Sequence, residues 1–404
     1  MALHELNVYC QASGAKINTN KTTMAVFGAS QATPSTWGFH EAGNSYKVLG
    51  VLLGKLAEVC NRKTWENILN KIESQLNVWR LRNLTLKGKV LVINALCISK
   101  LVHALTVTDL PGDILSKLKA IFSHFLWKRE KGLVSHATLI GDHGAGGLGL
   151  IDIYTKKKSL RLKIIKKYLD SSFTAPWKDF VIPTLRGLGH FGDYNLCQML
   201  PRSLFSALDP FEREVLEGWW SLRPWVSAEP KSLQQSLKVP LRFNPDLMGG
   251  GPGSGERMFS DTFERAGIST IGDLLDGSGN YDIVRVRTLF RSRGVLFRRA
   301  VVLRLAGRIR ESILRNWGSF LEGSSSGGDP GAERDVGFVL VDGTRFFGLS
   351  ECSTKRIYRI LIVGAFRRPA VERTWARTFP ALTITSIWAN MFNWYTAPKR
   401  LYGV

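Results

Sequence analysis

The segment from Gly144 to Gly149 has the spacing of a loop that could hold the phosphates of a dinucleotide. Its residues read G-A-G-G-L-G, and Asp170 follows near the distance expected for an acidic residue that contacts a ribose. Such a loop joins an apolar strand to a helix that opens on the last glycine. Here residues 135–138 have weak strand character, and residues 150–153 look extended. The glycines therefore predict a tight turn that lets the backbone pass close to a neighbour.

Asp342 ends an apolar, strand-like run that could suggest the first strand of a ribonuclease H domain. That chemistry needs several carboxylates around two metal ions. After Asp342 the only acidic residues are Glu351 and Glu372, and two glutamates cannot complete such a site. The dipeptide Asp342-Gly343 instead predicts a hairpin turn.

Histidine and cysteine give no catalytic or metal-binding pattern. His124, His136 and His143 share one region, but no Cys/His pairing accompanies them. The five cysteines are scattered and odd in number, which excludes a disulfide framework and a zinc ribbon. Reduced, buried thiols indicate an intracellular protein of the nucleus or the cytoplasm. The one G-x-S-x-G match, at 323–327, lies in a Gly/Ser-rich run and not between a strand and a helix, and no P-loop occurs. Hydrolase and NTPase functions therefore have no supporting motif, and we expect no small-molecule ligand.

Positive charge is the strongest chemical signal in the chain. Its 404 residues carry 55 Lys and Arg against 33 Asp and Glu, a formal net charge of +22. A field of that sign favours a polyanion, with nucleic acid as the first candidate. A charge that only keeps the protein soluble is the alternative.

The cations gather in a lysine-rich helix at 156–167 and in an arginine-rich stretch at 285–315. Lysine and arginine both neutralise phosphates, and the arginine fork can also grip them in two places. Either segment could instead be a solvated helix face, and the arginine stretch could be a core helix with a wet cationic face. The candidate phosphate contacts are Lys156, Lys157, Lys158, Arg161, Lys163, Lys166, Lys167, Arg298 and Arg299.

The elements that would position these residues follow from apolar periodicity, which predicts a mainly α protein with small β elements, an α+β fold. The predicted elements are helices at 65–79, 85–101, 111–126 and 156–168, strands at 25–27 and 46–53, a hairpin at 336–347 and a short helix capped by Ser353. The most apolar stretch, Val90–Val107, is interrupted by polar residues, which makes it too polar to span a bilayer. The interrupting residues are Asn94, Ser99, Lys100 and His103. No signal peptide begins the chain, so the sequence predicts a soluble protein without a membrane partner.

Several short motifs occur in a specific order. They are S-G-A-K-I-N-T-N-K-T at 13–22, Y-K-V-L-G at 46–50, a tryptophan- and leucine-rich stretch that leads to L-T-L-K-G-K-V at 65–90, F-L-W at 125–127 and G-G-L-G-L at 146–150. Over residues 1–170 this order resembles reverse transcriptases of non-LTR (LINE-type) retrotransposons. Residues 240–245 and 266–271 resemble the C-terminal region of that family more weakly.

The resemblance implies the end of the palm domain, then the thumb, then the downstream region of a polyprotein. The implied layout is the end of the palm at 1–55, a helical thumb-like domain at 56–175, a helical or irregular connector at 176–248, a Gly-rich linker at 249–256, an arginine-rich helical segment at 257–322, a Gly/Ser linker at 323–333 and a hairpin-plus-helix region at 334–404.

In that family, paired aspartates of an [FY]-x-D-D hairpin hold two Mg²⁺ ions upstream of the first motif. This chain has no Asp-Asp pair. The resemblance therefore implies a fragment or decayed copy that is inactive as a polymerase, holds no cofactor itself and binds RNA and DNA as template and primer. Lys16 and Lys21, which lie near the active site in the family, and Lys87 and Lys89, at the start of a thumb helix, are further candidates for nucleic-acid contact.

Two alternatives remain open. The gene model could be truncated, with an active polymerase as the true product. The chain could also be the product of a decayed reading frame without function. In that case Tyr46–Leu53 would have lost its strand partners and would expose an unpaired edge.

Overall fold

The computed structural model describes most of the chain. The described residues are 2–26, 39–41, 43–128, 134–188, 191–200, 202–206, 208–230, 232–247, 256–275, 281–300, 302–304, 306–307, 309–311, 313, 337–342 and 345–396. The predicted linker 323–333 and all but the last residue of the predicted linker 249–256 lie outside them. The described part is mainly helical with small sheets of two or three strands, which confirms the predicted fold class.

The chain divides into two compact units. The first comprises Met1–Thr85 and Ser99–Lys131, and the second comprises Leu86–Ile98 and Gly132–Val404. The second unit thus groups the predicted connector, the arginine-rich segment and the C-terminal region.

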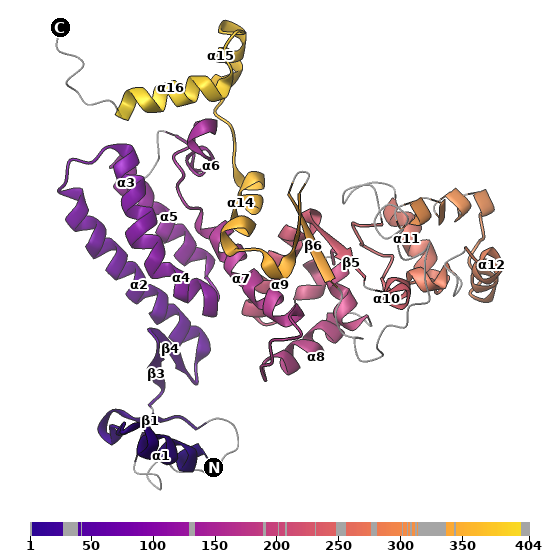
Figure 1. The fold of residues 1–404 in the computed structure, drawn as a ribbon, viewed down its shortest axis with the longest axis horizontal. Helices are drawn as coiled ribbons and strands as arrows, with labels where there is room; N and C mark the ends of the chain where they lie inside the picture. The colour runs from indigo at the N-terminus through magenta and orange to yellow at the C-terminus, as the bar shows by residue number, and fades with distance from the viewer. Residues whose placement is uncertain are drawn as a thin grey trace. The chain divides into compact units, whose positions relative to one another are not determined.

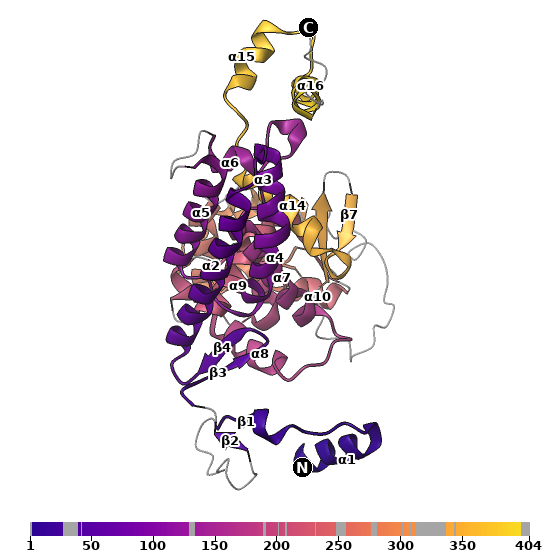
Figure 2. The same cartoon turned by 90° about the vertical axis from the view of Figure 1, so that its left-hand side faces the viewer.

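The first unit begins with short elements and continues with long helices (Figures 1 and 2). Its elements are α1 (Ala2–Ser13), η1 (Thr19–Lys21), β1 (Thr23–Met24), β2 (His40–Glu41), β3 (Ser45–Val48), β4 (Val51–Gly54), α2 (Ala57–Arg80), α4 (Ile98–Val107) and α5 (Gly112–Trp127). β1 pairs with β2 in parallel, and β3 pairs with β4 in antiparallel fashion.

The segment predicted as one strand, Tyr46–Leu53, is a hairpin. Leu49 and Gly50 both have positive φ angles, of 48° and 95°, and Val48 pairs with Val51 across them. Positive φ at both central residues is typical of two-residue hairpin turns. The two halves of the predicted strand therefore pair with each other, and the segment contains two strands in place of one.

Helices α2 and α5 pack against each other through the apolar stripes that periodicity predicts. α2 buries Trp65 completely, and its indole Nε1 donates a hydrogen bond to the Asp109 carbonyl oxygen at 2.8 Å. Asn61 Nδ2 donates to the Asp109 carboxylate at 2.9 Å. These bonds fix the residues just before α5 on α2, and Pro111 then precedes the first turn of α5. The helices predicted at 65–79 and after Pro111 are confirmed.

The second unit contains the remaining elements. They are α3 (Leu86–Val92), the π-helical η3 (Ile93–Cys97), α6 (His136–Leu139), η4 (His143–Ala145), α7 (Ile153–Leu169), α8 (Lys178–Leu188), η5 (Gly192–Cys197), η6 (Arg202–Phe205), α9 (Pro210–Leu222), η7 (Arg223–Trp225), β5 (Val226–Glu229), α10 (Leu233–Lys238), α11 (Glu256–Arg265), η8 (Ile271–Asp273), α12 (Ile283–Ser292), β6 (Gly337–Asp342), β7 (Arg345–Gly348), η10 (Leu349–Glu351), α14 (Thr354–Ala365), α15 (Val371–Thr378) and α16 (Ile384–Thr396).

Helix α7 packs against both α9 and α14 in the second unit, as Figure 1 shows. Strands β5, β6 and β7 form an antiparallel sheet in that order, so the predicted hairpin is confirmed. The indole of Trp219 on α9 is fully buried and meets the Phe338 ring of β6 edge-on, with 5.0 Å between ring centroids. The chain after the predicted linker 323–333 thus returns to the core, where Ser353 caps α14 as predicted.

The residues 86–107 form helix without a break through α3, η3 and α4. By length and composition, Leu86–Val107 would suffice to cross a membrane, and 44% of its apolar window is buried inside the protein. The buried face includes Ile93, Cys97 and Leu101. Core helices have the same character, so this finding is weak support for a membrane span.

The glycine cluster forms a tight turn, as the sequence predicts. Gly146 and Gly149 have φ angles of 78° and 66°, which favour glycine. A Cβ on Gly147 would overlap with the backbone of Gly141, and a Cβ on Gly146 would overlap with the indole of Trp388. Glycine at 147 therefore lets two backbone segments approach closely, and glycine at 146 leaves room for the Trp388 ring.

We expect Gly147→Ala to lower the free energy of unfolding by about 1–3 kcal/mol, since its methyl group forces two backbone segments apart. Gly187→Ala in α8 is the matched control, because nothing lies within 4 Å of its added Cβ. That variant should be neutral or more stable by up to about 1 kcal/mol. Denaturant unfolding of both variants measures the difference, and equal effects would contradict the close approach at Gly147.

Candidate nucleic-acid interface

Helix α7, the predicted lysine-rich helix, begins at a buried carboxylate. Asp152 precedes its first residue, and one carboxylate oxygen accepts bonds from the Thr155 backbone N–H and hydroxyl, both at 2.8 Å. The other oxygen lies 3.0 Å from His136 Nε2. Burial opposes ionisation of Asp152, but the hydrogen bonds from His136 and Thr155 outweigh it and lower its pKa to about 2.

The same residue connects α7 to α14. The Asp152 backbone N–H donates to the Tyr358 hydroxyl oxygen at 3.0 Å. Burial raises the pKa of Tyr358 to about 12, so this hydroxyl keeps its proton at physiological pH.

The low pKa of Asp152 predicts acid sensitivity. A carboxyl whose folded pKa lies below its unfolded value adds stability above the unfolded pKa, and this stability is lost as pH falls towards the folded pKa. Between pH values of about 4 and 2 the wild type should lose about 2 kcal/mol more stability than Asp152→Asn, given 1.36 kcal/mol per pKa unit. Urea unfolding across this pH range measures both proteins. Parallel pH profiles would contradict the role of the ionised carboxylate.

Two of the predicted phosphate contacts on α7 are buried in an ion-pair cluster. Lys157 Nζ lies 2.6 Å from Glu214 Oε1, and Arg161 NH2 lies 2.7 Å from Glu214 Oε2. The Arg161 side chain is fully buried, and its guanidinium lies over the Phe211 ring. The predictions for Lys157 and Arg161 are corrected, because a carboxylate of α9 already occupies the place that a phosphate would take.

Other cations of α7 also have partners inside the protein. Lys158 donates to the Ser221 hydroxyl at 2.7 Å, and Lys166 donates to the Cys352 carbonyl oxygen. Lys156 is half-buried near the Tyr358 ring, and burial followed by the charge of Lys163 lowers its pKa. The exposed members of the run are Lys163 and Lys167. Helix α7 is therefore a core helix with a narrow basic edge.

We expect Glu214→Gln to lower the free energy of unfolding by about 3–5 kcal/mol, because two buried cations lose their charge partner. Glu264→Gln is the matched control. Glu264 pairs with Arg242 at the surface, with 47% of its side chain exposed, and exposed pairs contribute up to about 1 kcal/mol. Chemical denaturation compares the two variants, and equal losses would contradict the buried cluster.

The four candidates implied by the family resemblance divide between the two units. Lys16 and Lys21 are exposed in the first unit, beside and within η1. Lys87 is exposed at the start of α3 in the second unit, and Lys89 is half-buried two residues further along. Burial, followed by the charge of Lys87, lowers the pKa of His143 in the glycine turn.

The arginine-rich stretch, unlike α7, has most of its described cations exposed at the surface. Arg298 and Arg299 are exposed, as predicted for residues that contact a polyanion. Six further arginines of the predicted stretch 285–315 are exposed with them. We call the eight together the arginine surface: Arg285, Arg287, Arg291, Arg293, Arg298, Arg299, Arg304 and Arg310. The buried residues between them, such as Val302, Ala306 and Ile309, have the three- to four-residue spacing of a helix with one side in the core.

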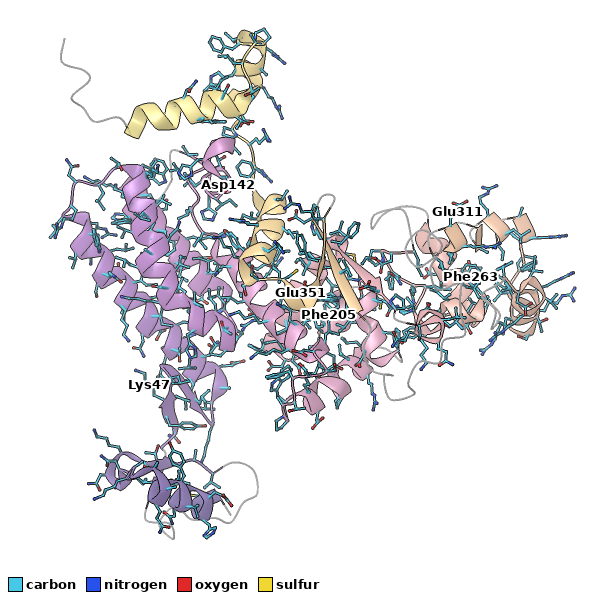
Figure 3. All side chains as sticks on the ribbon, viewed as in Figure 1. Lys47, Asp142, Phe205, Phe263, Glu311 and Glu351 are labelled. Atoms are coloured by element: carbon cyan, nitrogen blue, oxygen red, sulfur yellow. The ribbon has the colours of Figure 1, made fainter. Side chains whose placement is uncertain are left out.

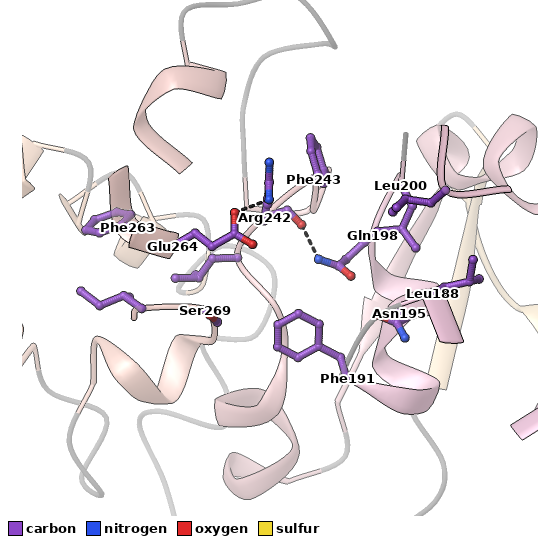
Figure 4. Close-up of a pocket in the computed structure, with 13 residues that line it drawn as sticks. Leu188, Phe191, Asn195, Gln198, Leu200, Arg242, Phe243, Phe263, Glu264 and Ser269 are labelled. Atoms are coloured by element: carbon purple, nitrogen blue, oxygen red, sulfur yellow. Dashed lines mark hydrogen bonds and ion pairs between the residues drawn. The ribbon is translucent and has the colours of Figure 1, made fainter. Parts of the chain in front are cut away.

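A small pocket with a mainly apolar lining lies between the segments 188–204 and 241–269 of the second unit (Figure 4). It has a volume of about 130 Å³, and its wall includes Phe191, Phe243 and Arg242. The Arg242 guanidinium pairs with Asp261 at 2.9 Å and with Glu264. Because two carboxylates neutralise its one cationic side chain, this pocket is not suited to a phosphate.

Metal binding finds no support in the described part of the chain. Among those residues, no group of three or more His, Cys, Asp or Glu side chains could hold a metal ion.

Comparisons with known proteins place these features in context. No model of a known protein family matches the chain. The chain is 24% identical over 337 residues to the "Transposon TX1 uncharacterized 149 kDa protein" of Xenopus laevis, which covers 80% of this chain and 25% of that protein. The chain is thus similar to a transposon protein over most of its length. The alignment is longer than residues 1–170, so this similarity extends beyond the segment that carries most of the motifs.

A second relative comes from Arabidopsis thaliana. The chain is 28% identical over 109 residues to a "Putative ribonuclease H protein", a match that covers 26% of this chain and 18% of that protein. The matched part of the chain thus spans a quarter or less of the length of either relative.

Proposed function

We propose that the chain is the thumb and downstream region of a retrotransposon reverse transcriptase and that it holds RNA and DNA as template and primer. The observation that carries the proposal is the agreement between motif order and structural elements. The strand motif falls on the β3–β4 hairpin, the tryptophan-rich motif on α2, and the glycine motif on the turn before α7. The relationship to a transposon protein over 80% of the chain supports the same assignment.

The exposed lysines are the groups that would contact phosphates in this region. They are Lys16, Lys21, Lys87, Lys163 and Lys167. Each phosphate that they neutralise releases counterions, which makes binding weaken steeply with salt. The buried cations of α7 have a different role in this proposal, because they hold the helix that carries Lys163 and Lys167.

We assign no catalytic step to the chain. It contains no Asp-Asp pair for polymerase metal ions. Ribonuclease H chemistry, which the name of the plant relative suggests, needs more carboxylates than the two glutamates that follow Asp342.

Binding to a fluorescent RNA–DNA hybrid and to single-stranded RNA across a salt series tests the proposal. We expect micromolar or tighter binding that weakens steeply with salt. Lys163→Glu/Lys167→Glu should reduce the salt slope by up to about 2, one for each lost phosphate contact. Lys71→Glu/Lys119→Glu, which changes the same number of exposed lysines on α2 and α5, is the control and should bind as the wild type does. If the folded protein binds neither probe at low salt, the proposal fails.

A further inference from the structure

The arginine surface exposes more cations than α7, whose exposed cations are Lys163 and Lys167. Between Ile283 and Arg310 the sequence has nine arginines and no acidic residue. Eight of the nine are described, and all eight are exposed. Figure 3 labels Glu311, the first carboxylate after this run, at the outer side of the region and Phe263 in its interior.

An apolar frame holds these arginines in place. Val286 and Phe290 on α12 are fully buried, and the Phe290 ring meets Phe263 and Phe297 edge-on, with ring centroids 6.0 and 5.3 Å away. Val302, Ile309 and Ile313 extend the same core. Because one side of these helical segments is fixed in the core, the arginines on the other side face solvent from a supported backbone.

In the described part of the chain, most of the arginine surface has no carboxylate partner, unlike three other arginines of this unit. Arg161, Arg223 and Arg242 each pair with a carboxylate at 2.5–2.9 Å. Within the described residues, the ion pairs of the arginine surface are limited to Arg285, whose NH2 lies 4.0 Å from Asp273. Like charges without counter-charges repel one another, and this repulsion is relieved when a polyanion binds.

The region also lacks an exposed aromatic side chain among the residues that the structure describes. Phe290 is fully buried, and Tyr281 and Phe297 are half-buried against the core. Proteins that hold single strands stack bases on exposed rings, whereas contacts to the phosphates of a duplex need cations alone. The composition of the surface therefore favours a duplex over a single strand.

We propose that the arginine surface binds the phosphate backbone of a nucleic-acid duplex without reading its bases. This inference rests on the proposed function, because it names the contact surface and the form of nucleic acid. The surface belongs to residues 285–310, downstream of the motifs that resemble the thumb. It would grip duplex independently of the lysines named above.

The test compares two variants that each remove four positive charges from the full chain. The first is Arg287→Gln/Arg291→Gln/Arg298→Gln/Arg299→Gln on the arginine surface. The matched control is Lys63→Gln/Lys71→Gln/Lys100→Gln/Lys119→Gln, which changes four exposed lysines outside it. The probes are 20-base-pair RNA–DNA hybrids of two unrelated sequences, a single-stranded RNA of 20 nucleotides and poly-glutamate.

We expect the arginine variant to bind both duplexes at least about tenfold more weakly at 100 mM salt and to lose about 3–4 from the salt slope. The control should keep the wild-type slope. Both variants should keep the wild-type melting temperature, because the substituted side chains are exposed. If the fourfold variant fails to fold, the pairs Arg287→Gln/Arg291→Gln and Arg298→Gln/Arg299→Gln should each give about half the loss of slope.

The possible failures are distinguishable. If the wild type binds neither duplex nor single strand, the proposed function and this inference fail together. If the wild type binds and the arginine variant matches the control, this inference alone is wrong. Loss of binding that depends on duplex sequence, an equal loss for single-stranded RNA, or wild-type binding to poly-glutamate as tight as to duplex would also overturn it.

Discussion

Glu214 places one carboxylate between α7 and α9, where it meets two cations of α7. Its oxygens lie 2.6 Å from Lys157 and 2.7 Å from Arg161, and the Arg161 side chain is fully buried. Removing such charges from water is costly, so the helices must approach in a register that keeps all three groups together. The same helix α9 carries Trp219 against Phe338 of the sheet. The register at Glu214 therefore links α7 to the sheet core.

The opposite side of α7 meets the C-terminal part of the chain. The Tyr358 hydroxyl accepts from the Asp152 backbone N–H at the start of α7, and Lys166 donates to the Cys352 carbonyl oxygen further along. A helix whose sequence is rich in lysine is thereby enclosed by α9 and α14. Its positive charge stabilises the interior through specific partners, and a small part of it remains at the surface on Lys163 and Lys167.

The sequence predicted the elements whose structure follows from local pattern. The stripes of α2 and α5, the β6–β7 hairpin and the glycine turn all depend on residues that are close in the chain. The turn at Leu49 and Gly50 was not predicted, because leucine is not a typical turn residue. Its positive φ angle becomes evident only in the structure. The burial of Arg161 was not predicted for another reason: its partner Glu214 lies 53 residues later, and periodicity carries no information about such pairs.

The arginines of the second unit show why net charge alone could not locate a binding surface. Arg161 and Arg223 are fully buried and face carboxylates, so their charge is used within the fold. Arg287 and Arg291 lie on α12, whose inward positions hold Val286 and Phe290, and no residue that the structure describes gives them an ion pair. The arginines of this unit thus include paired interior groups, such as Arg161 and Arg223, and unpaired surface groups, such as Arg287 and Arg291. A phosphate can pair with an arginine that has no carboxylate partner in the protein. The unpaired surface arginines, and not the total number of cations, therefore predict where a polyanion would bind.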